Sequence, residues 1–238
     1  MTPVATDPRD VGPANGKPGS LRLVRTAAVT VGLLITIVVV FSTMRIVVDW
    51  PNIVDGTVPD DDFAERYVDN PWRAYLHIGP GLVYLVGAPL QLSRRFRARH
   101  YTVHRRLGRV LLTCALVSAV FALLFGIPLA WGGAGESVAT VVFGSWFIVC
   151  LVLAFRAIRC DDVPRHRRWM IRAFAVGVGI GTIRIWVGVF EGIDRGVSGG
   201  AAPAGPDPTM FAVAFWLAFT MHVAIGEWWL RRTPALSG

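Results

Sequence analysis

Charged side chains are scarce in this chain of 238 residues: they make up 17% of it, whereas hydrophobic residues make up 53%. Together with a mean hydropathy of +0.51, this excludes an intrinsically disordered chain, because disorder requires low hydrophobicity. Five stretches of about 19 to 22 residues carry almost no charge, and each is long enough to cross the roughly 30 Å hydrocarbon layer as a helix. The composition predicts an all-α, polytopic transmembrane helix bundle.

Cysteine is also rare. Cys114, Cys150 and Cys160 are odd in number and lack CxxC spacing, so neither a disulfide framework nor a thiolate metal site is indicated. No phosphate-binding glycine loop is present, and Ser, His and Asp are not arranged for nucleophilic catalysis. Outside the spans and the N-terminal tail no segment exceeds 25 residues, which excludes a separate catalytic domain. Whether the protein is an enzyme is left open.

Six spans with short connections are expected. Residues 1–20 are rich in Pro, Gly and Asp without periodicity and are predicted to form a disordered tail, and residues 233–238 form a C-terminal tail. The first span is longer than the apolar run of about 7 to 15 residues in a signal peptide, which favours an uncleaved anchor. The expected spans cover residues 26–48, 74–93, 110–131, 137–155, 169–190 and 209–230.

The charges are distributed unevenly between the two sides. Residues 1–25, residues 231–238 and the connections 94–109 and 156–168 hold 18 basic residues, whereas the alternate connections hold three, together with 11 acidic residues. Since cytoplasmic segments retain an excess of Lys and Arg, both termini are predicted to be cytoplasmic. The net charge of +8 then reflects topology and contact with the lipid bilayer and its anionic headgroups, and nucleic acid is not expected as a partner.

The longest connection, residues 49–73, is acidic. It contains Asp60, Asp61 and Asp62, followed by a short amphipathic helix expected over Phe63 to Val68. A calcium site is disfavoured because the spacing of a calcium-binding loop is missing. The role of this connection is left open.

Ionisable residues within spans are costly, so they are the first candidates for function. In the second span, His77, Tyr84 and Gln91 fall on one helical face. By helical rise, His77 lies about 5 Å and Arg184 about 9 Å from the outer end, which predicts a shared polar layer. Gln91 lies near the inner end and is assigned either to this layer or to the inner rim. The alternative interpretation is a small-residue packing seam with structural pairing of Arg184.

Arg172 and Glu227 are expected to pair on the inner side. Arg172 lies three residues from the start of the fifth span and Glu227 three from the end of the sixth. Their equal depth predicts a structural ion pair that joins the last two helices.

The two inner connections repeat a basic phrase, His104-Arg105-Arg106 with Arg109 and then His166-Arg167-Arg168. It indicates either the usual positive-inside excess or a converged site for lipid phosphate or another anion. The spacing of His100 and His104, with His166, is compatible with metal ligation, but the surrounding arginines disfavour a cation, so no metal is expected. The candidate anion ligands at this rim are His104, Arg105, Arg109, His166 and Arg168.

The segments LHIGPGLVYLVGAPLQLSRRFRARHYTVHRRLGR (Leu76 to Arg109), HRRWMIRAFA (His166 to Ala175) and IRIW (Ile183 to Trp186), with the late Glu227, resemble the bacterial membrane family called domain of unknown function 2306 (DUF2306). The resemblance covers about residues 74–230. It implies a multi-pass protein of the bacterial cytoplasmic membrane, but it implies no reaction. The family residues it marks here are His77, Gln91, His104, Arg105, Gly108, Arg109, His166, Trp169, Met170, Arg172, Arg184 and Glu227.

Three classes of function are left open. The favoured one is the binding or transport of a small anionic or lipid-like ligand at the layer lined by His and Arg. The second is redox chemistry with haem b or a quinone; His77 and His222 differ in depth by about 15 Å, so a haem would need His222 with His104 or His166. The third is a structural role in a homo-oligomer or with a membrane partner.

Overall fold

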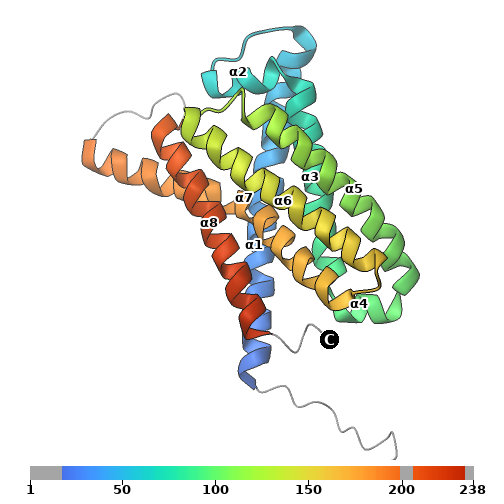
Figure 1. Ribbon diagram of the computed structural model, residues 1–238. Helices are drawn as coiled ribbons and strands as arrows, with labels where there is room; N and C mark the ends of the chain where they lie inside the picture. The colour runs from blue at the N-terminus through green and yellow to red at the C-terminus, as the bar shows by residue number, and fades with distance from the viewer. Residues whose placement is uncertain (1–17, 199–205, 234–238) are drawn as a thin grey trace, which may run out of the picture. The chain divides into compact units, whose positions relative to one another are not determined.

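The computed structural model describes residues 18–198 and 206–233. Contacts divide the chain into two units, residues 1–33 and 34–238. The described part of the first unit, residues 18–33, is helical and belongs to α1 (Pro18–Asp55). The second unit contains the remainder of α1 and seven further helices, and no strand occurs in the ranges described (Figure 1): α2 (Asp62–Val68), α3 (Pro71–Leu92), α4 (Arg94–Arg99), α5 (Tyr101–Gly126), α6 (Gly133–Arg159), α7 (Val163–Ser198) and α8 (Pro208–Arg232).

Five helices of the described chain are long and apolar enough to cross a membrane: Arg22–Asp55, Tyr101–Gly126, Gly133–Arg159, Val163–Val197 and Pro208–Arg232. The all-helical architecture is therefore as expected, whereas the count of six spans is not reached. The missing one is α3, which has 22 residues and the length of a span. Its two prolines and its histidine, tyrosines and glutamine lower its hydropathy.

The helices extend beyond the apolar runs from which the spans were predicted. α5 begins at Tyr101 and α7 at Val163, because the arginine-rich segments before the apolar residues also form helix. α1 likewise begins at Pro18, inside the expected tail, with a proline that suits a first helical turn; residues 1–17 of that tail lie outside the described residues. α5 ends at Gly126 rather than at residue 131, shortly before Pro128, which has no amide hydrogen for a helical bond.

α3 and α5 run antiparallel in close contact. A Cβ added at Gly81 would lie 2.8 Å from Ser118 Oγ, one at Gly87 would lie 2.6 Å from Leu111 Cδ2, and one at Gly108 would lie 3.4 Å from Gln91 Oε1. The register is constant along both helices, so they share the same depth. We call the end at which α3 begins the α2 end, and the end at which α5 begins the α4 end.

Helices α7 and α8 form a second close antiparallel pair. A Cβ at Gly179 would lie 3.0 Å from Phe219 Cδ1, and one at Gly226 would lie 2.9 Å from the Cβ of Ala175. α6 packs beside α8 with the same direction, since Trp216 Nε1 donates to the carbonyl of Gly135 at 3.0 Å, and Phe143 and Phe219, each farther along its helix, stack at 5.2 Å. Small residues thus bring the helix backbones close together, as is common in membrane bundles.

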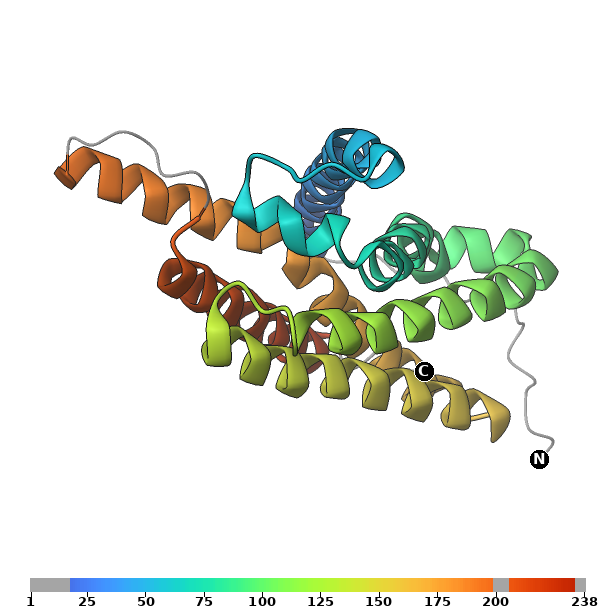
Figure 2. The same cartoon turned by 90° about the horizontal axis from the view of Figure 1, so that it is seen from above.

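α2 lies across the α2 end, in the middle of the surrounding helices (Figure 2). The Asp61 carboxylate caps it by accepting from Phe63 N at 2.9 Å. The buried Phe63 ring packs 5.3 Å from Trp131 and 5.7 Å from Phe211, centroid to centroid. The short helix predicted in the acidic connection is therefore confirmed, and it closes one end of the bundle.

We predict that Gly181→Ala destabilises the fold, because its new Cβ would lie 2.9 Å from the backbone oxygen of Leu34 on α1. Overpacking of this kind costs about 1–3 kcal/mol, or roughly 2–10 °C in apparent Tm. The matched control is Gly188→Ala on the same helix, where nothing lies within 4 Å; its Tm should stay level or rise. Thermal unfolding in detergent checks both, and equal Tm values for the two variants would contradict this packing.

Candidate ligand-binding cavity

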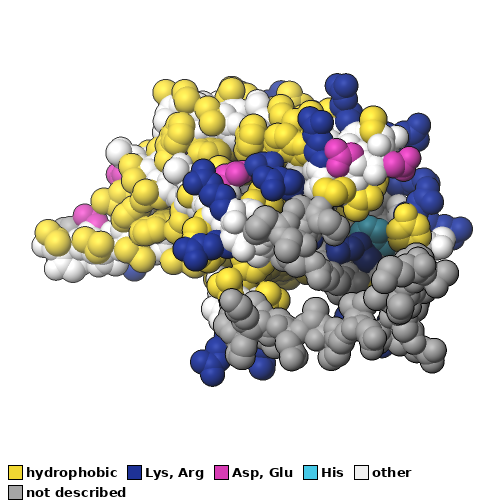
Figure 3. All heavy atoms as spheres, turned by 60° about the horizontal axis from the view of Figure 1, so that its bottom comes forward, with side chains coloured by type: hydrophobic (Ala, Val, Ile, Leu, Met, Phe, Trp, Pro, Cys, Tyr) yellow, Lys and Arg dark blue, Asp and Glu magenta, His cyan; other side chains and the backbone are white. Residues whose placement is uncertain are grey.

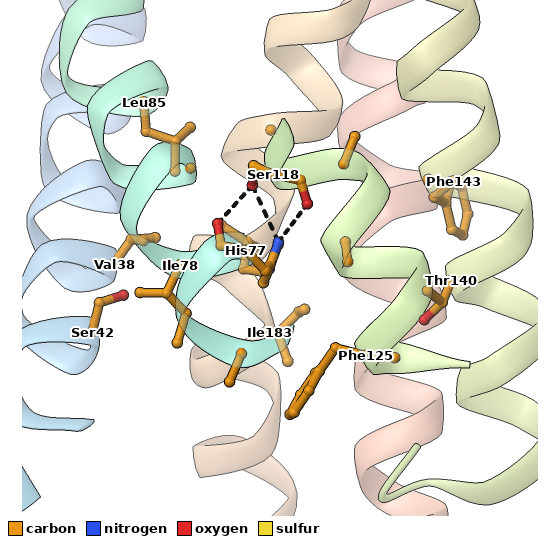
Figure 4. A pocket seen from close by; sticks show the side chains of 18 of the residues that line it. Val38, Ser42, His77, Ile78, Leu85, Ser118, Phe125, Thr140, Phe143 and Ile183 are labelled. Atoms are coloured by element: carbon orange, nitrogen blue, oxygen red, sulfur yellow. Dashed lines mark hydrogen bonds between the residues drawn. The ribbon is translucent and has the colours of Figure 1, made fainter. Parts of the chain in front are cut away.

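A cavity of about 250 Å³ lies in the second unit and is lined by residues from α1, α2, α3, α5, α6, α7 and α8. Most of its lining is apolar. Figure 4 shows Val38, Ile78 and Phe125 around it, with Phe143 and Ile183 from the helices opposite. Such a volume corresponds to about eight water-sized groups. The cavity can therefore hold a short apolar chain or a small ring.

Three arginines gather where the cavity approaches the α2 end. Arg45, Arg66 and Arg184 come from α1, α2 and α7, and all three line the cavity. Their guanidinium carbons lie 5.9, 4.1 and 5.7 Å from the centroid of the Phe63 ring. We call these three residues the arginine cluster. The aromatic face stabilises cations that have been removed from water.

Two carboxylates neutralise the arginine cluster only in part. Asp49, fully buried, lies 3.3 Å from Arg45 Nε and accepts a 2.8 Å hydrogen bond from Tyr75 Oη. Glu136 is buried as well and lies 3.8 Å from Arg66 Nη1. Among the described residues, Arg184 has no carboxylate within 4.0 Å. Three cations with two anions leave one net positive charge beside the cavity.

Some donors of the arginine cluster have no acceptor. Arg66 Nη1 donates to the carbonyl of Leu129 at 3.0 Å. Arg66 Nε and Arg45 Nη1, by contrast, are buried and have no hydrogen-bond partner among the described atoms. An unmade bond of a buried polar group costs about 1–3 kcal/mol, and more for a charged one. Because both nitrogens are buried, the net charge of the cluster, and not these two donors, is what it presents to an anion in the cavity.

The remaining predicted residues of the polar layer occupy the cavity wall, except Gln91. His77 Nδ1 lies 3.0 Å from the carbonyl oxygen of Ser118, and Ser118 Oγ donates to the His77 carbonyl at 2.7 Å (Figure 4). Tyr84 lies deeper, is 3% exposed and has a hydroxyl without a partner. Gln91 is not among the lining residues. It lies 14 residues, or about 21 Å, from His77 towards the α4 end, so the expected polar layer does not extend to it.

At the α4 end, arginines spread over the surface rather than converging in a pocket (Figure 3). Arg105 and Arg109 are exposed, and Arg168 is half-buried. His166 Nδ1 lies 2.9 Å from the carbonyl oxygen of Ala154. The buried atoms His104 Nδ1 and the side-chain amide of Gln91 have no hydrogen-bond partner among the described residues. This arrangement suits contact with many headgroups better than recognition of one anion.

The histidines considered for metal or haem lie apart from the cavity, except His77. His222 is buried on α8, with Nδ1 2.9 Å from the carbonyl oxygen of Ala218 and 3.5 Å from Thr182 Oγ1. It is not a lining residue. Within the described ranges, no group of three or more His, Cys, Asp or Glu side chains is placed to hold a metal ion.

Sequence reasoning missed Arg45, Arg66 and Glu136. Arg66 could have been noticed in the sequence, because it is one of only three basic residues in the connections that hold 11 acidic ones. Arg45 lies near the end of the predicted first span, residues 26–48, where an arginine is common and gives no separate signal. Glu136 gave no pattern of its own, because its partner Arg66 is 70 positions away in the sequence.

The structure brings Arg172 and Glu227 together in a two-pronged contact near the α4 end. Arg172 Nε donates to Glu227 Oε1, and Nη2 donates to Oε2 at 3.0 Å. The guanidinium carbon also lies 4.7 Å from the centroid of the Trp169 ring. The planar guanidinium matches a carboxylate in this geometry, so the pair joins α7 to α8.

We predict that Arg172→Leu or Glu227→Leu each lowers the apparent Tm by roughly 5 °C, because the partner loses its bidentate bonds at a cost of about 2 kcal/mol. The exchanged double variant, Arg172→Glu with Glu227→Arg, should recover part of that loss. Thermal unfolding in detergent provides the measurement. Additive losses in the Arg172→Leu/Glu227→Leu double variant would show that the two side chains do not stabilise each other.

Comparison with known proteins agrees with the motifs in the sequence. A family model described as predicted membrane protein (DUF2306) matches residues 74–230. No curated protein and no solved structure matches the chain. The match covers 157 of 238 residues and includes His77, Tyr84 and Arg184, but not Arg45 or Arg66. This match and the five long apolar helices of the described chain together show a multi-pass membrane protein, and the chain belongs to the DUF2306 family.

Proposed function

We propose that the protein binds, or carries across the membrane, an amphipathic anion whose headgroup contacts the arginine cluster and whose apolar part fills the cavity. The observation that carries this proposal is the net positive charge of Arg45, Arg66 and Arg184 against Asp49 and Glu136, held beside an apolar space of about 250 Å³. A small anion alone would use the charge but leave the apolar space unfilled. A neutral lipid chain would do the reverse.

The burial of the arginine cluster supports the same ligand class. The Arg66 side chain is 9% exposed and that of Arg45 is 17% exposed. Charges removed from water interact more strongly because the local dielectric constant is lower. Arg184 lines the cavity and has no carboxylate within 4.0 Å among the described residues, so its guanidinium suits a phosphate or carboxylate oxygen. The headgroup can therefore be a lipid phosphate or a free medium-chain anion.

We further propose six spans, with α3 as the sixth, in the bacterial cytoplasmic membrane. The support is that α3 keeps a constant antiparallel register with α5 from Gly81 to Gln91, so it crosses the same depth as a helix that qualifies as a span. At 22 residues, α3 extends about 33 Å.

The charges support cytoplasmic termini. The α4 end carries most arginines of the described helices, and the α2 end carries most acidic residues. The positive-inside rule then assigns the α4 end to the cytoplasm, where exposed arginines meet anionic headgroups. A homo-oligomer or a membrane partner is compatible with this topology and belongs to the same proposal.

Decyl phosphate tests the ligand class, because its length suits the cavity and its headgroup suits the arginine cluster. Arg184→Gln should weaken its binding about 10-fold to 100-fold, since a hydrogen bond to a charged group contributes about 1.5–3 kcal/mol. The control is Arg106→Gln at the exposed α4 end, which should bind like the wild type. Calorimetric titration of the protein in lipid nanodiscs, with empty nanodiscs subtracted, gives the affinities. Equal affinity for uncharged decanol would refute an anion site.

Cysteine labelling tests the topology. A membrane-impermeant maleimide should label Asp60→Cys, beyond the α2 end, in intact spheroplasts. It should label the exposed native Cys160, between α6 and α7, only after permeabilisation. Cys160→Ser shows which signal belongs to Cys160, because Cys150 is buried and Cys114 is half-buried. Labelling of Cys160 in intact spheroplasts would reverse the proposed orientation.

A further inference from the structure

The imidazole of His77 is held in one tautomer by α5. Its Nδ1 lies 3.0 Å from the carbonyl oxygen of Ser118, and Ser118 Oγ donates to the His77 carbonyl at 2.7 Å (Figure 4). Because a carbonyl oxygen only accepts, Nδ1 must carry the hydrogen of that contact. The opposite tautomer would set the Nδ1 lone pair against the carbonyl oxygen. In neutral His77, Nε2 is therefore an unprotonated acceptor.

The Nε2 atom of His77 faces the cavity. It has no hydrogen-bond partner among the described residues, and it keeps accessible surface. On the same face of α3, Ala74 and Tyr84 are buried, whereas Val83 and Val86 on the outer face are exposed. Since His77 belongs to the inner face and lines the cavity, the surface that Nε2 keeps opens into the cavity.

His77 and Arg184 lie at about the same depth in the cavity wall. A Cβ added at Gly177 on α7 would lie 3.2 Å from Tyr84 Cε1 on α3, so these two positions are about level. His77 comes seven residues before Tyr84, and Arg184 seven residues after Gly177. Each is thus about 10 Å nearer the α2 end. A headgroup held by Arg184 therefore lies at the level of His77 Nε2.

The acceptor at Nε2 restricts the headgroups that suit this site. Ionised carboxylates, sulfate esters and phosphate diesters carry no O–H group, so each would set an oxygen lone pair against the Nε2 lone pair. A phosphate monoester loses its second proton with a pKa of about 6. It is therefore already an anion while it still carries an O–H group. Such a headgroup satisfies both the Arg184 guanidinium and the His77 acceptor.

We propose that the cavity selects a phosphate monoester, whose anionic oxygens contact Arg184 and whose P–O–H group donates a hydrogen bond to His77 Nε2. This inference rests on the proposed function for the headgroup contact, and it narrows the ligand class. Arg184 attracts the charge, and His77 recognises the remaining proton. The apolar part of the ligand occupies the rest of the cavity, whose volume is about 250 Å³.

Decyl phosphate and decyl sulfate test this inference, because the two probes share chain length and a tetrahedral headgroup. They are titrated into the protein in nanodiscs at about pH 6, where much of the phosphate keeps its O–H group. The wild type should bind decyl phosphate about 10-fold to 100-fold more tightly than decyl sulfate, as expected for a hydrogen bond with a charged partner.

His77→Asn should lose this preference. The asparagine amide can still donate to the Ser118 carbonyl, but the shorter side chain has no group in place of Nε2. The matched control is His166→Asn, because His166 Nδ1 makes the same kind of contact with the carbonyl oxygen of Ala154, and His166 does not line the cavity. This control should behave like the wild type.

Arg184→Gln separates this inference from the function on which it rests. It should weaken the binding of both probes and keep their ratio, because it removes charge and leaves His77 in place. Equal binding of both probes by the wild type would overturn the role of His77, and the headgroup site would stand if Arg184→Gln still weakens decyl phosphate. A preference that survives in His77→Asn would also overturn it, because the charge of the phosphate would then explain the preference. Failure of the wild type to bind either probe would refute both proposals.

The tautomer of His77 gives a readout that is independent of affinity. In protein with isotope-labelled histidine nitrogens, the NMR signals lost in His77→Asn should be those of a protonated Nδ1 and an unprotonated Nε2. Decyl phosphate should move this Nε2 signal, and decyl sulfate should leave it in place. A protonated Nε2 in the free protein, or equal shifts with both probes, would contradict the inference.

The lipid of the nanodisc distinguishes two sources of the headgroup. Phosphatidic acid is a phosphate monoester, whereas phosphatidylglycerol is a diester. If the ligand is a membrane lipid, decyl phosphate should bind more weakly in discs that contain phosphatidic acid than in discs that contain phosphatidylglycerol, with empty discs of each composition subtracted. Equal binding in both discs would assign the site to a free alkyl phosphate. Competition by phosphatidylglycerol alone would contradict the selection of monoesters.

Discussion

The cost of keeping charged guanidinium groups away from water determines how the α2 end is built. Arg45, Arg66 and Arg184 all adjoin the ring of Phe63, while Asp49 and Glu136 supply the counter-charges. Breaking such a network leaves uncompensated buried charge, which is strongly destabilising. The short helix α2 is essential here, since it contributes both Phe63 and Arg66. Without it, the arginines on α1 and α7 would face each other across an open cavity.

Close helix packing explains why a cavity remains next to this network. Glycines let α3 approach α5, and α7 approach α8, until a Cβ would meet the neighbour within about 3 Å. Between these pairs stand aromatic residues of α6 and α8, including Phe143 and Phe219, whose rings stack at 5.2 Å. Rigid rings and rigid backbones cannot collapse into a residual space as flexible side chains can. The space between the two helix pairs therefore persists beside the arginines.

Much of the helical framework could be predicted from the sequence, because an apolar run of membrane length directly encodes a span. Depth along a helix could also be predicted from the sequence. Counting residues from the span ends puts Arg172 and Glu227 at the same depth, and their side chains are in contact. The same counts put Gln91 about 21 Å from His77, and only the helical face that the two residues share, which continues through every depth, linked Gln91 to the polar layer. Helix ends were harder to predict, because the arginine-rich segments before Val110 and Trp169 are polar and nevertheless helical.

The candidate site was harder to predict because its members are related only through the fold. The arginine cluster comes from three helices, and Arg66 and Glu136 become partners only when α2 folds over the bundle. Hydropathy marks a charged residue in or near a span as costly, but it does not identify the residue that compensates it. Tyr84 could be assigned to the correct helical face. Its missing hydrogen bond could be seen only once the neighbouring helices were in place.

The two ends of the bundle use arginine in different ways, and this difference favours the α2 end as the site of selective binding. At the α4 end, Arg105, Arg106 and Arg109 are exposed, so water and salt screen their charges. At the α2 end, Arg66 is 9% exposed and rests on an aromatic face. The cost of removing the Arg66 guanidinium from water has already been offset within the folded protein. An incoming anion therefore displaces little water from it. Electrostatic attraction is strongest and most dependent on geometry in such surroundings, which supports the arginine cluster as the proposed site for one anion, whereas the exposed arginines at the α4 end suit the contact proposed with anionic headgroups.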